Sequence, residues 1–195
     1  DEVVGDANQV VFVRGGEAFR MRGPLPDGYA ELIITPDFET LSELAHVDGQ
    51  HLADHPLFAM RSCRIDPELQ RFRTWFREWV IAGEHHESLA VEEMVLTLMR
   101  SALHQPQRCK APHRPSTARV IRKAKEYLSA HAADRILLGD VARAAGVSPA
   151  YLTDLFSRVE GVSLHRYLTQ LRLAHALAAL RHCDDLTSLA LESGF

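Results

Sequence analysis

The 195-residue sequence predicts an α+β protein that is mostly α-helical: a partial β unit, a helical hairpin and an all-α C-terminal domain. Three observations predict this fold class. Short β-branched runs alternate with glycine and proline turns in the first part of the chain, and apolar residues then recur at helical steps. One helix-and-turn pattern occurs twice near the C-terminus, and such internal repeats are rarely accidental.

The β unit is predicted for residues 1–60. Runs rich in β-branched residues at 10–13 and 30–34 predict strands, because such side chains pack well on a pleated surface. Glycine and proline between these runs predict turns, at Gly15-Gly16, Gly23-Pro24 and Pro26-Asp27-Gly28.

Residues 61–104 are predicted to form a helical hairpin, because their apolar side chains recur at steps of three and four. These residues are Leu69, Phe72, Phe76, Trp79 and Val80, then Leu89, Val95, Leu96, Met99 and Leu103. Trp75 adds to an aromatic stripe, which is typical of a buried helix face and, less often, of a dimer seam or a ligand wall. The following segment 105–117 contains three prolines that a helix cannot accommodate, so it is predicted to be a linker.

The repeated pattern is Leu138-x-x-Val141-Ala142-x-x-x-Gly146-Val147, which returns 48 residues later as Leu186-x-x-Leu189-Ala190-x-x-x-Gly194-Phe195. Each copy predicts a short helix that ends at a glycine, whose freedom at positive φ permits a sharp turn. After the first copy, Ser148 and Pro149 are typical of the N-cap and first position of a new helix. The sequence therefore predicts a helix-turn-helix of the kind that enters a DNA groove.

The helix predicted for 149–159 has a buried side formed by Leu152, Leu155 and Phe156. Of its outer residues, Thr153 can contact a thymine, Asp154 can accept from a cytosine amino group and Arg158 can bind phosphate. The alternative for Asp154 is an ordinary surface carboxylate near a helix N-terminus. The predicted DNA-binding residues are Ser148, Ala150, Tyr151, Thr153, Asp154, Arg158 and Arg166.

A further helix is predicted from Leu164 to about Arg181, with Ser163 as its N-cap. Its 18 residues would span about 27 Å, near the roughly 34 Å that separates successive major-groove faces of B-DNA. The helix predicted for 186–192 begins a second helix-turn-helix. The helix that would follow the turn at Gly194 is not in the sequence.

These motifs resemble the AraC/XylS family of bacterial transcription regulators over residues 118–195. The matching residues are Ser148-x-x-Tyr151-Leu152-x-x-x-Phe156, then Gly161-Val162-Ser163-x-x-x-Tyr167-Leu168-x-x-x-Arg172-Leu173-x-x-Ala176. The resemblance implies a DNA-binding domain with two helix-turn-helix units joined by a long helix, the second unit being truncated here. It also implies base contacts from the positions of Ala150, Thr153 and Asp154, with Ala150 in place of a longer side chain.

The N-terminal segment 6–12, with Gly16, Glu17 and Arg20, is similar to the later part of the cupin-like sensor domains found in a subset of that family. The resemblance implies a partial sensor pocket followed by a helical pair that mediates dimers. It does not identify an inducer.

The formal net charge of -4 conceals an uneven distribution along the chain. Residues 1–115 carry 12 Lys and Arg against 18 Asp and Glu, whereas residues 118–172 carry 9 against 5. Positive charge therefore gathers around the first helix-turn-helix, which supports nucleic-acid binding without establishing it, since a solvated surface can carry the same balance.

The sequence gives no indication of membrane insertion, secretion or a metal site. It lacks an apolar run of about 18 residues and begins with Asp1-Glu2 instead of a signal segment, so we expect a cytoplasmic, nucleoid-associated protein. Two clusters contain several metal-ligating residue types, but glycine interrupts the first and neither places its side chains on one helix face. The clusters are His46, Asp48, His51, Asp54 and His55, and then His85-His86-Glu87.

We therefore expect a sequence-specific regulator of transcription, controlled by an N-terminal sensor and dimerisation domain, without enzyme activity, cofactor or metal. The expected partner is double-stranded promoter DNA, bound by a homodimer; RNA polymerase, as partner of an activator, and a small-molecule effector are further candidates. One alternative is a truncated partner that dimerises with a full-length regulator and blocks it. Another is a DNA-repair enzyme carrying this module, but Cys63, Cys109 and Cys183 are neither paired nor flanked by a His and Glu arrangement.

Overall fold

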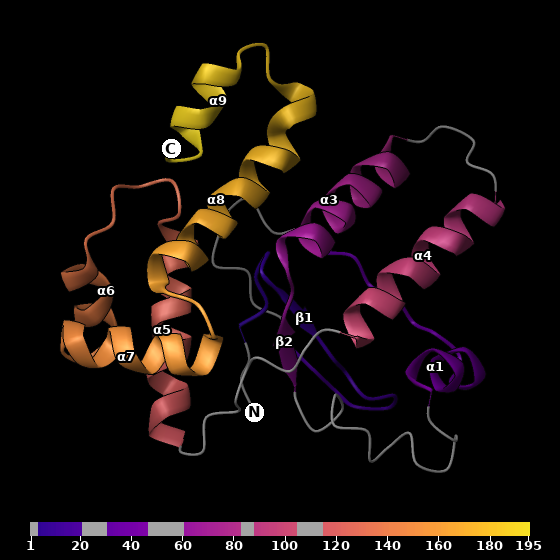
Figure 1. The fold of residues 1–195 in the computed structure, drawn as a ribbon, viewed down its shortest axis with the longest axis horizontal. Coiled ribbons are helices and arrows are strands. Elements are labelled where there is room, and N and C mark those ends of the chain that lie inside the picture. Colours follow the sequence, from indigo (N-terminus) through magenta and orange to yellow (C-terminus); the bar gives the residue numbers. More distant parts are fainter. Residues whose placement is uncertain (1–3, 21–30, 47–60, 83–87, 105–114) are drawn as a thin grey trace. The chain divides into compact units, whose positions relative to one another are not determined.

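The computed structural model describes residues 4–20, 31–46, 61–82, 88–104 and 115–195 (Figure 1). The chain divides into two compact units, one of Val10–Pro106 and one that joins Asp1–Gln9 to Gln107–Phe195. The predicted fold class is confirmed, because helices dominate both units and the only sheet among the described residues has two strands. None of the described helices is long and apolar enough to cross a membrane. The predicted boundaries at 60, 104 and 117 stay predictions.

The unit Val10–Pro106 contains a strand pair, three helices and a small core. Strand β1 (Gln9–Val11) pairs with β2 (Ser62–Arg64), and the helices are α1 (Phe38–Ala45), α3 (Pro67–Ile81) and α4 (Ser88–Leu103). The fully buried members of this core are Ile65, Leu69, Phe76 and Leu98.

Two features of this unit differ from the sequence prediction. The strand predicted for 30–34 is wrong over its described part, since residues 31–34 form no strand. Leu32 and Ile34 pack against the core while Ile33 is exposed, so the alternating pattern reflects burial without a neighbouring strand to pair the backbone. Helix α1 was not predicted, although Asp37 caps it by accepting from the Thr40 backbone N–H at 2.8 Å.

The predicted helical hairpin is confirmed as α3 and α4. Asp66 caps α3 by accepting from the Leu69 backbone N–H at 2.8 Å, and a proline occupies its first turn. The aromatic stripe divides between core and surface, because Phe76 is fully buried whereas Trp75 is 47% exposed. The Trp75 ring stacks at 6.0 Å between centroids on that of Trp79.

The C-terminal domain is a series of helices, most of which share one core. It contains α5 (Pro115–Ala130), α6 (Leu138–Ala145), α7 (Pro149–Glu160), α8 (Leu164–Ala179) and α9 (Leu186–Glu192), with a 3-10 turn at Leu180–His182. In Figure 1, α5, α6 and α7 gather around one end of α8, and α9 follows its other end. The 16 residues of α8 correspond to about 24 Å of helix, slightly less than predicted.

The sequence repeat corresponds to a repeated helix ending. Gly146 after α6 and Gly194 after α9 both adopt the left-handed conformation, with φ of 74° and 87°. The next residue then donates to a carbonyl of the last turn: Val147 N–H to Ala142 O at 3.0 Å, and Phe195 N–H to Ala190 O at 2.9 Å. Both copies therefore end in the same hydrogen-bonded turn.

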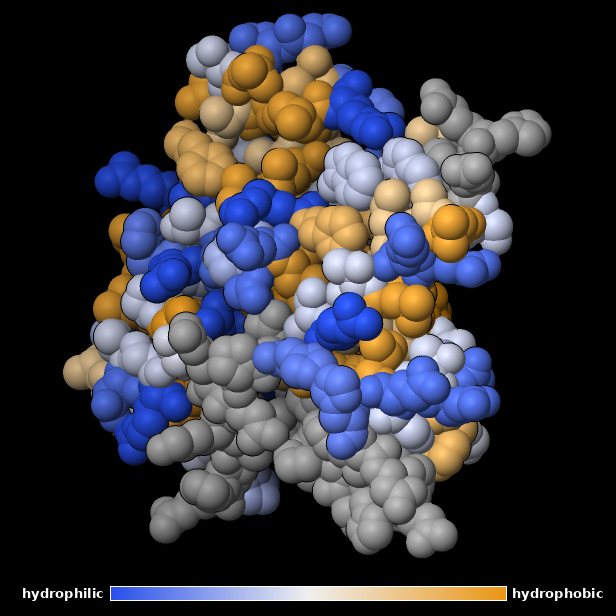
Figure 2. Space-filling view, turned by 45° about the vertical axis from the view of Figure 1, so that its right-hand side comes forward, coloured by the Kyte–Doolittle hydropathy of each residue, from blue (hydrophilic) through white to orange (hydrophobic). Residues whose placement is uncertain are grey.

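The second copy is less buried than the first. Figure 2 shows hydrophobic residues gathered at the top of the view. In Figure 1, α9 and the C-terminal end of α8 lie there. Leu189 is the buried residue of α9, while the large apolar side chains exposed in this region are Leu180, Leu186, Leu191 and Phe195. By contrast, α6 buries three residues against its neighbours.

Candidate nucleic-acid interface

The start of α7 is fixed by local chemistry that the sequence predicted. Gly146 turns the chain after α6, and the Ser148 hydroxyl oxygen accepts from the Tyr151 backbone N–H at 3.3 Å. Pro149 follows at the first helical position, where its missing N–H costs nothing. Two helices are thus joined by a three-residue turn, which is the geometry of a helix-turn-helix.

Helix α7 has one buried side and one exposed side. Leu152, Leu155 and Phe156 lie in the core between α5, α6 and α8. The predicted contact residues on this helix are all exposed: Ala150, Tyr151, Thr153, Asp154 and Arg158. The outward face that groove recognition requires is therefore present, although the DNA contacts themselves stay predictions.

Three of these side chains already have partners within α7. The Thr153 hydroxyl donates to the Pro149 carbonyl at 2.9 Å, which leaves its methyl group and its lone pairs for an external partner. Asp154 and Arg158 form an ion pair one turn apart, with side chains 69% and 60% exposed. Exposed pairs of this kind contribute little to stability, so both side chains can be drawn to DNA at small cost.

Arg166 lies on a different element from the other predicted contacts. It is exposed in the first turn of α8, where its backbone N–H donates to the Ser163 hydroxyl at 3.2 Å. The Ser163 cap was predicted, and it fixes the position at which α8 begins.

Sequence reasoning missed a buried ion pair that fixes the end of α7. The Lys125 ammonium on α5 lies 3.2 Å from the Glu160 carboxylate, and both side chains are 6% exposed. Lys125 also lies over the Tyr167 ring, 5.7 Å from its centroid. Nothing in the sequence marks these two residues, because helical periodicity assigns charged side chains to the solvent face.

Tyr167 of α8 is fully buried in the core beside α7. Its ring meets Phe156 of α7 edge to face at 5.3 Å between centroids. Burial raises the pKa of the Tyr167 phenol well above its usual value, and the nearby carboxylates of Asp6 and Glu160 raise it further. The hydroxyl therefore stays protonated and acts as a hydrogen-bond donor.

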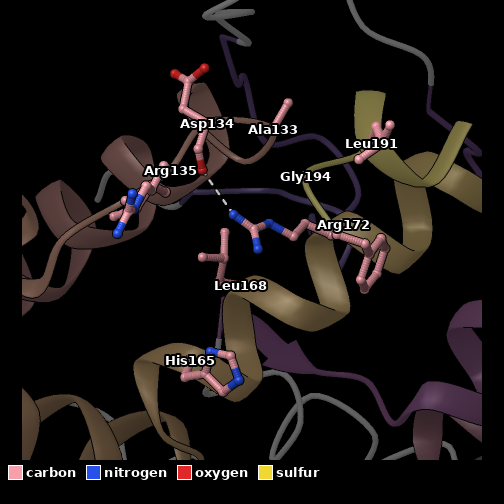
Figure 3. Close-up of a pocket in the computed structure, with 10 residues that line it drawn as sticks. Ala133, Asp134, Arg135, His165, Leu168, Arg172, Leu191 and Gly194 are labelled. Carbon is pink, nitrogen blue, oxygen red and sulfur yellow. Dashed lines mark hydrogen bonds between the residues drawn. The ribbon is translucent and has the colours of Figure 1, made fainter. Parts of the chain in front are cut away.

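A hollow of about 380 Å³ lies between the segment after α5, helix α8 and the end of the chain (Figure 3). Arg172 crosses it and donates to two backbone carbonyls, Ala132 O at 2.7 Å and Asp134 O at 2.8 Å. The other residues around the hollow include Arg135, His165, Leu168 and Gly194. The Arg172 guanidinium therefore bonds α8 to the segment that follows α5, beside the end of the chain.

Neither alternative chemistry considered from the sequence gains support from the described residues. They contain no cluster of three metal-ligating side chains, and only His46 of the two predicted clusters lies among them. Cys63 is buried, and the half-buried Cys183 thiol donates to the Leu180 carbonyl at 3.2 Å. Cys109 lies outside the described residues.

Comparison with known proteins finds matches to the C-terminal part of the chain. Residues 141–195 match the family model described as a helix-turn-helix domain. The regulatory protein PocR of Salmonella typhimurium is 33% identical over 76 residues, covering 38% of this chain and 25% of that protein. The melibiose operon regulatory protein of Escherichia coli is 29% identical over 133 residues, covering 63% of this chain and 44% of that protein.

The chain thus spans a quarter to less than half the length of these curated relatives. No solved structure matches it. The match of residues 141–195 to an AraC-type helix-turn-helix domain confirms the resemblance over that part of the chain, which rested on the motifs at 148–156 and 161–176.

Proposed function

We propose that this protein is a sequence-specific DNA-binding regulator of transcription in which α7 reads base edges in a major groove. The observation that supports it best is the exposed face of α7, whose opposite side is anchored in the core of an AraC-type domain. Two relatives whose names describe regulatory proteins add support. Double-stranded promoter DNA is the partner that this proposal requires.

The exposed side chains divide into two roles. Thr153 and Asp154 lie near the N-terminal end of α7, which enters the groove in this motif, and they contact bases. Arg158 lies one turn further along and binds phosphate, which positions the helix without reading sequence. Ser148, Ala150, Tyr151 and Arg166 complete the interface.

The ion pair between Asp154 and Arg158, which the sequence alone did not predict, affects how strongly the domain binds different DNA sequences. Asp154 neutralises a phosphate-binding cation in the free domain. Its negative charge therefore opposes binding to arbitrary DNA, and a site that supplies a donor for its carboxylate offsets that repulsion.

We further propose that the N-terminal unit controls the regulator as a sensor and dimerisation domain, acting in the cytoplasm as a homodimer. Exposed large apolar side chains on the helical hairpin support an interface there; they include Trp75, Ile81 and Leu89. A small-molecule effector and RNA polymerase are compatible with this arrangement and are not identified by it.

Selection from a random duplex library tests the proposed reading of DNA. The chain should enrich a defined sequence, and Thr153→Ala and Asp154→Ala should each weaken binding to it by about 1 to 3 kcal/mol if the contacts are direct. Asp154→Ala should at the same time strengthen binding to a scrambled duplex, because Arg158 is released. Arg158→Ala should weaken both duplexes alike and reduce the slope of log K against log salt by about 1.

Ser157→Ala is the matched control, since Ser157 is exposed on the same helix and has no predicted role. Failure to enrich any sequence would contradict the proposal. Equal losses on enriched and scrambled duplexes for Thr153→Ala and Asp154→Ala would remove these two residues from the reading set.

A further inference from the structure

Residues 4–9, here called the N-terminal strap, belong to the same compact unit as the C-terminal helices. Within the strap, Asn8 is 1% exposed and Gln9 is 7% exposed. Ala7 packs against the core formed by α5 to α8. The strap is thus part of the helical domain, although more than 100 residues separate it from α5 in the sequence.

Two side chains of the strap bind Tyr167 at opposite ends of that residue. The Asp6 carboxylate accepts from the Tyr167 hydroxyl and, at 3.5 Å, from the Ser129 hydroxyl of α5. The Asn8 side-chain amide donates to the Tyr167 backbone carbonyl at 3.2 Å. The Asn8 backbone N–H also donates to Asp6 at 2.9 Å, which fixes the two side chains relative to each other.

The same tyrosine contacts the C-terminal half of α7 with its ring. Phe156 meets the ring edge to face, and Lys125 lies over it while bound to Glu160, the last residue of α7. A continuous set of contacts therefore runs from Asp6 through Tyr167 to the reading helix.

Burial makes these contacts strong and specific. Tyr167 is fully buried, so removing Asp6 would take the charged acceptor from its hydroxyl at a place that solvent does not reach. A hydrogen bond to a charged acceptor is stronger than one between neutral groups, and an unpaired buried donor carries the full cost of desolvation.

We propose that Asp6 is a positioning residue for DNA recognition: it holds Tyr167, and Tyr167 holds the C-terminal half of α7. The strap is then required for the DNA-binding domain to hold α7 in position. The effect on DNA rests on the proposed function of α7, whereas the effect on the fold does not.

A double-mutant cycle on the full chain tests the contact. Asp6→Ala and Tyr167→Phe should each lower the thermal midpoint by roughly 3 to 10 °C, since each removes one side of a charged hydrogen bond. The double variant should lose little more than Asp6→Ala alone, which also removes the bonds from Ser129 and the Asn8 backbone. Asp6→Asn, which keeps one acceptor oxygen, should lose less than Asp6→Ala, and the exposed control Asp184→Ala should leave the midpoint unchanged.

Hydrogen exchange then tests whether the contact positions α7. In Tyr167→Phe, which keeps the ring, amides of residues 156–160 should exchange several-fold faster, while those of α9 should not change. Additive losses in the cycle, or faster exchange confined to the strap, would overturn the proposal. If the cycle couples and exchange rises but no duplex is enriched, the positioning holds and the proposed function of α7 fails.

Discussion

Glycine ends both copies of the repeat, but the two positions place different demands on the residue. At Gly146 an added Cβ would meet no atom within 4 Å, so only the positive φ requires glycine. At Gly194 an added Cβ would lie 2.9 Å from the Ala133 carbonyl oxygen and 2.8 Å from Arg172 Nε. The second glycine is therefore needed both for backbone conformation and for space.

We predict that Gly194→Ala destabilises the protein more than Gly146→Ala does. The positive φ alone costs about 1 kcal/mol for a residue with a Cβ, whereas the close carbonyl adds a clash that the backbone must relieve. Urea unfolding followed by circular dichroism measures both free energies. Gly139→Ala is the control, because this glycine lies in α6 with open space around it, and it should be neutral or slightly stabilising. Equal losses at 146 and 194 would contradict the steric argument.

At the scale of the elements, the buried pair of Lys125 and Glu160 fixes where α7 ends against α5. A buried charge is tolerated only with its partner, so the pair contributes more to the position of α7 against α5 than to net stability. The pair of Arg122 and Glu126 on the same α5 helix is different, because its side chains are 26% and 46% exposed.

We predict that Glu160→Ala destabilises the domain by about 3 to 5 kcal/mol, because it leaves the Lys125 ammonium buried without its partner. Combining it with Lys125→Met should recover much of that loss, since the charge is then removed and its volume is kept. Differential scanning calorimetry of the three variants measures the effect. Glu126→Ala, which breaks the pair with Arg122 from its exposed side, should cost only about 0.3 to 0.5 kcal/mol. A loss as small for Glu160→Ala would show that water reaches the Lys125 ammonium.

Helix prediction from the sequence succeeded for α7 and α8, which begin at a serine cap, but it missed α1, although Asp37 caps that helix. Asp66, Ser148 and Ser163 each cap a helix with a side-chain oxygen, and the predicted starts of α7 and α8 are confirmed. The strand predicted for 30–34 failed in its described part because strand formation depends on a partner. Alternation of apolar residues reports which side chains are buried, and it does not supply that partner.

At the scale of the whole molecule, exposed aromatic and aliphatic side chains on α3 and α4 bear on the proposed homodimer. The Trp75 ring is nearly half exposed although it stacks on Trp79, and Ile81 and Leu89 are 65% and 64% exposed. Large apolar side chains exposed on this pair of helices favour an association surface there.

We predict that the chain of 21.9 kDa sediments as a dimer and that Trp75→Glu converts it to a monomer, because a buried carboxylate at the interface would have no partner. Sedimentation equilibrium over a range of concentrations measures the association constant. Leu191→Glu places the same charge on an exposed leucine of α9 and should leave the association unchanged. A monomeric wild type, or equal effects of the two variants, would contradict an interface on the hairpin.

The sequence by itself determined the local features: the repeat, the caps at Ser148 and Ser163, the turn at Gly146 and the exposed side of α7. These follow from interactions between residues a few positions apart, which periodicity and residue type report directly. Only the tertiary structure decided that Asp6 and Asn8 bind Tyr167, that Lys125 pairs with Glu160 and that Arg172 joins Ala132 to α8. Such contacts join residues 35 to 161 positions apart, and their partners are selected by burial in the assembled domain, which no local pattern encodes.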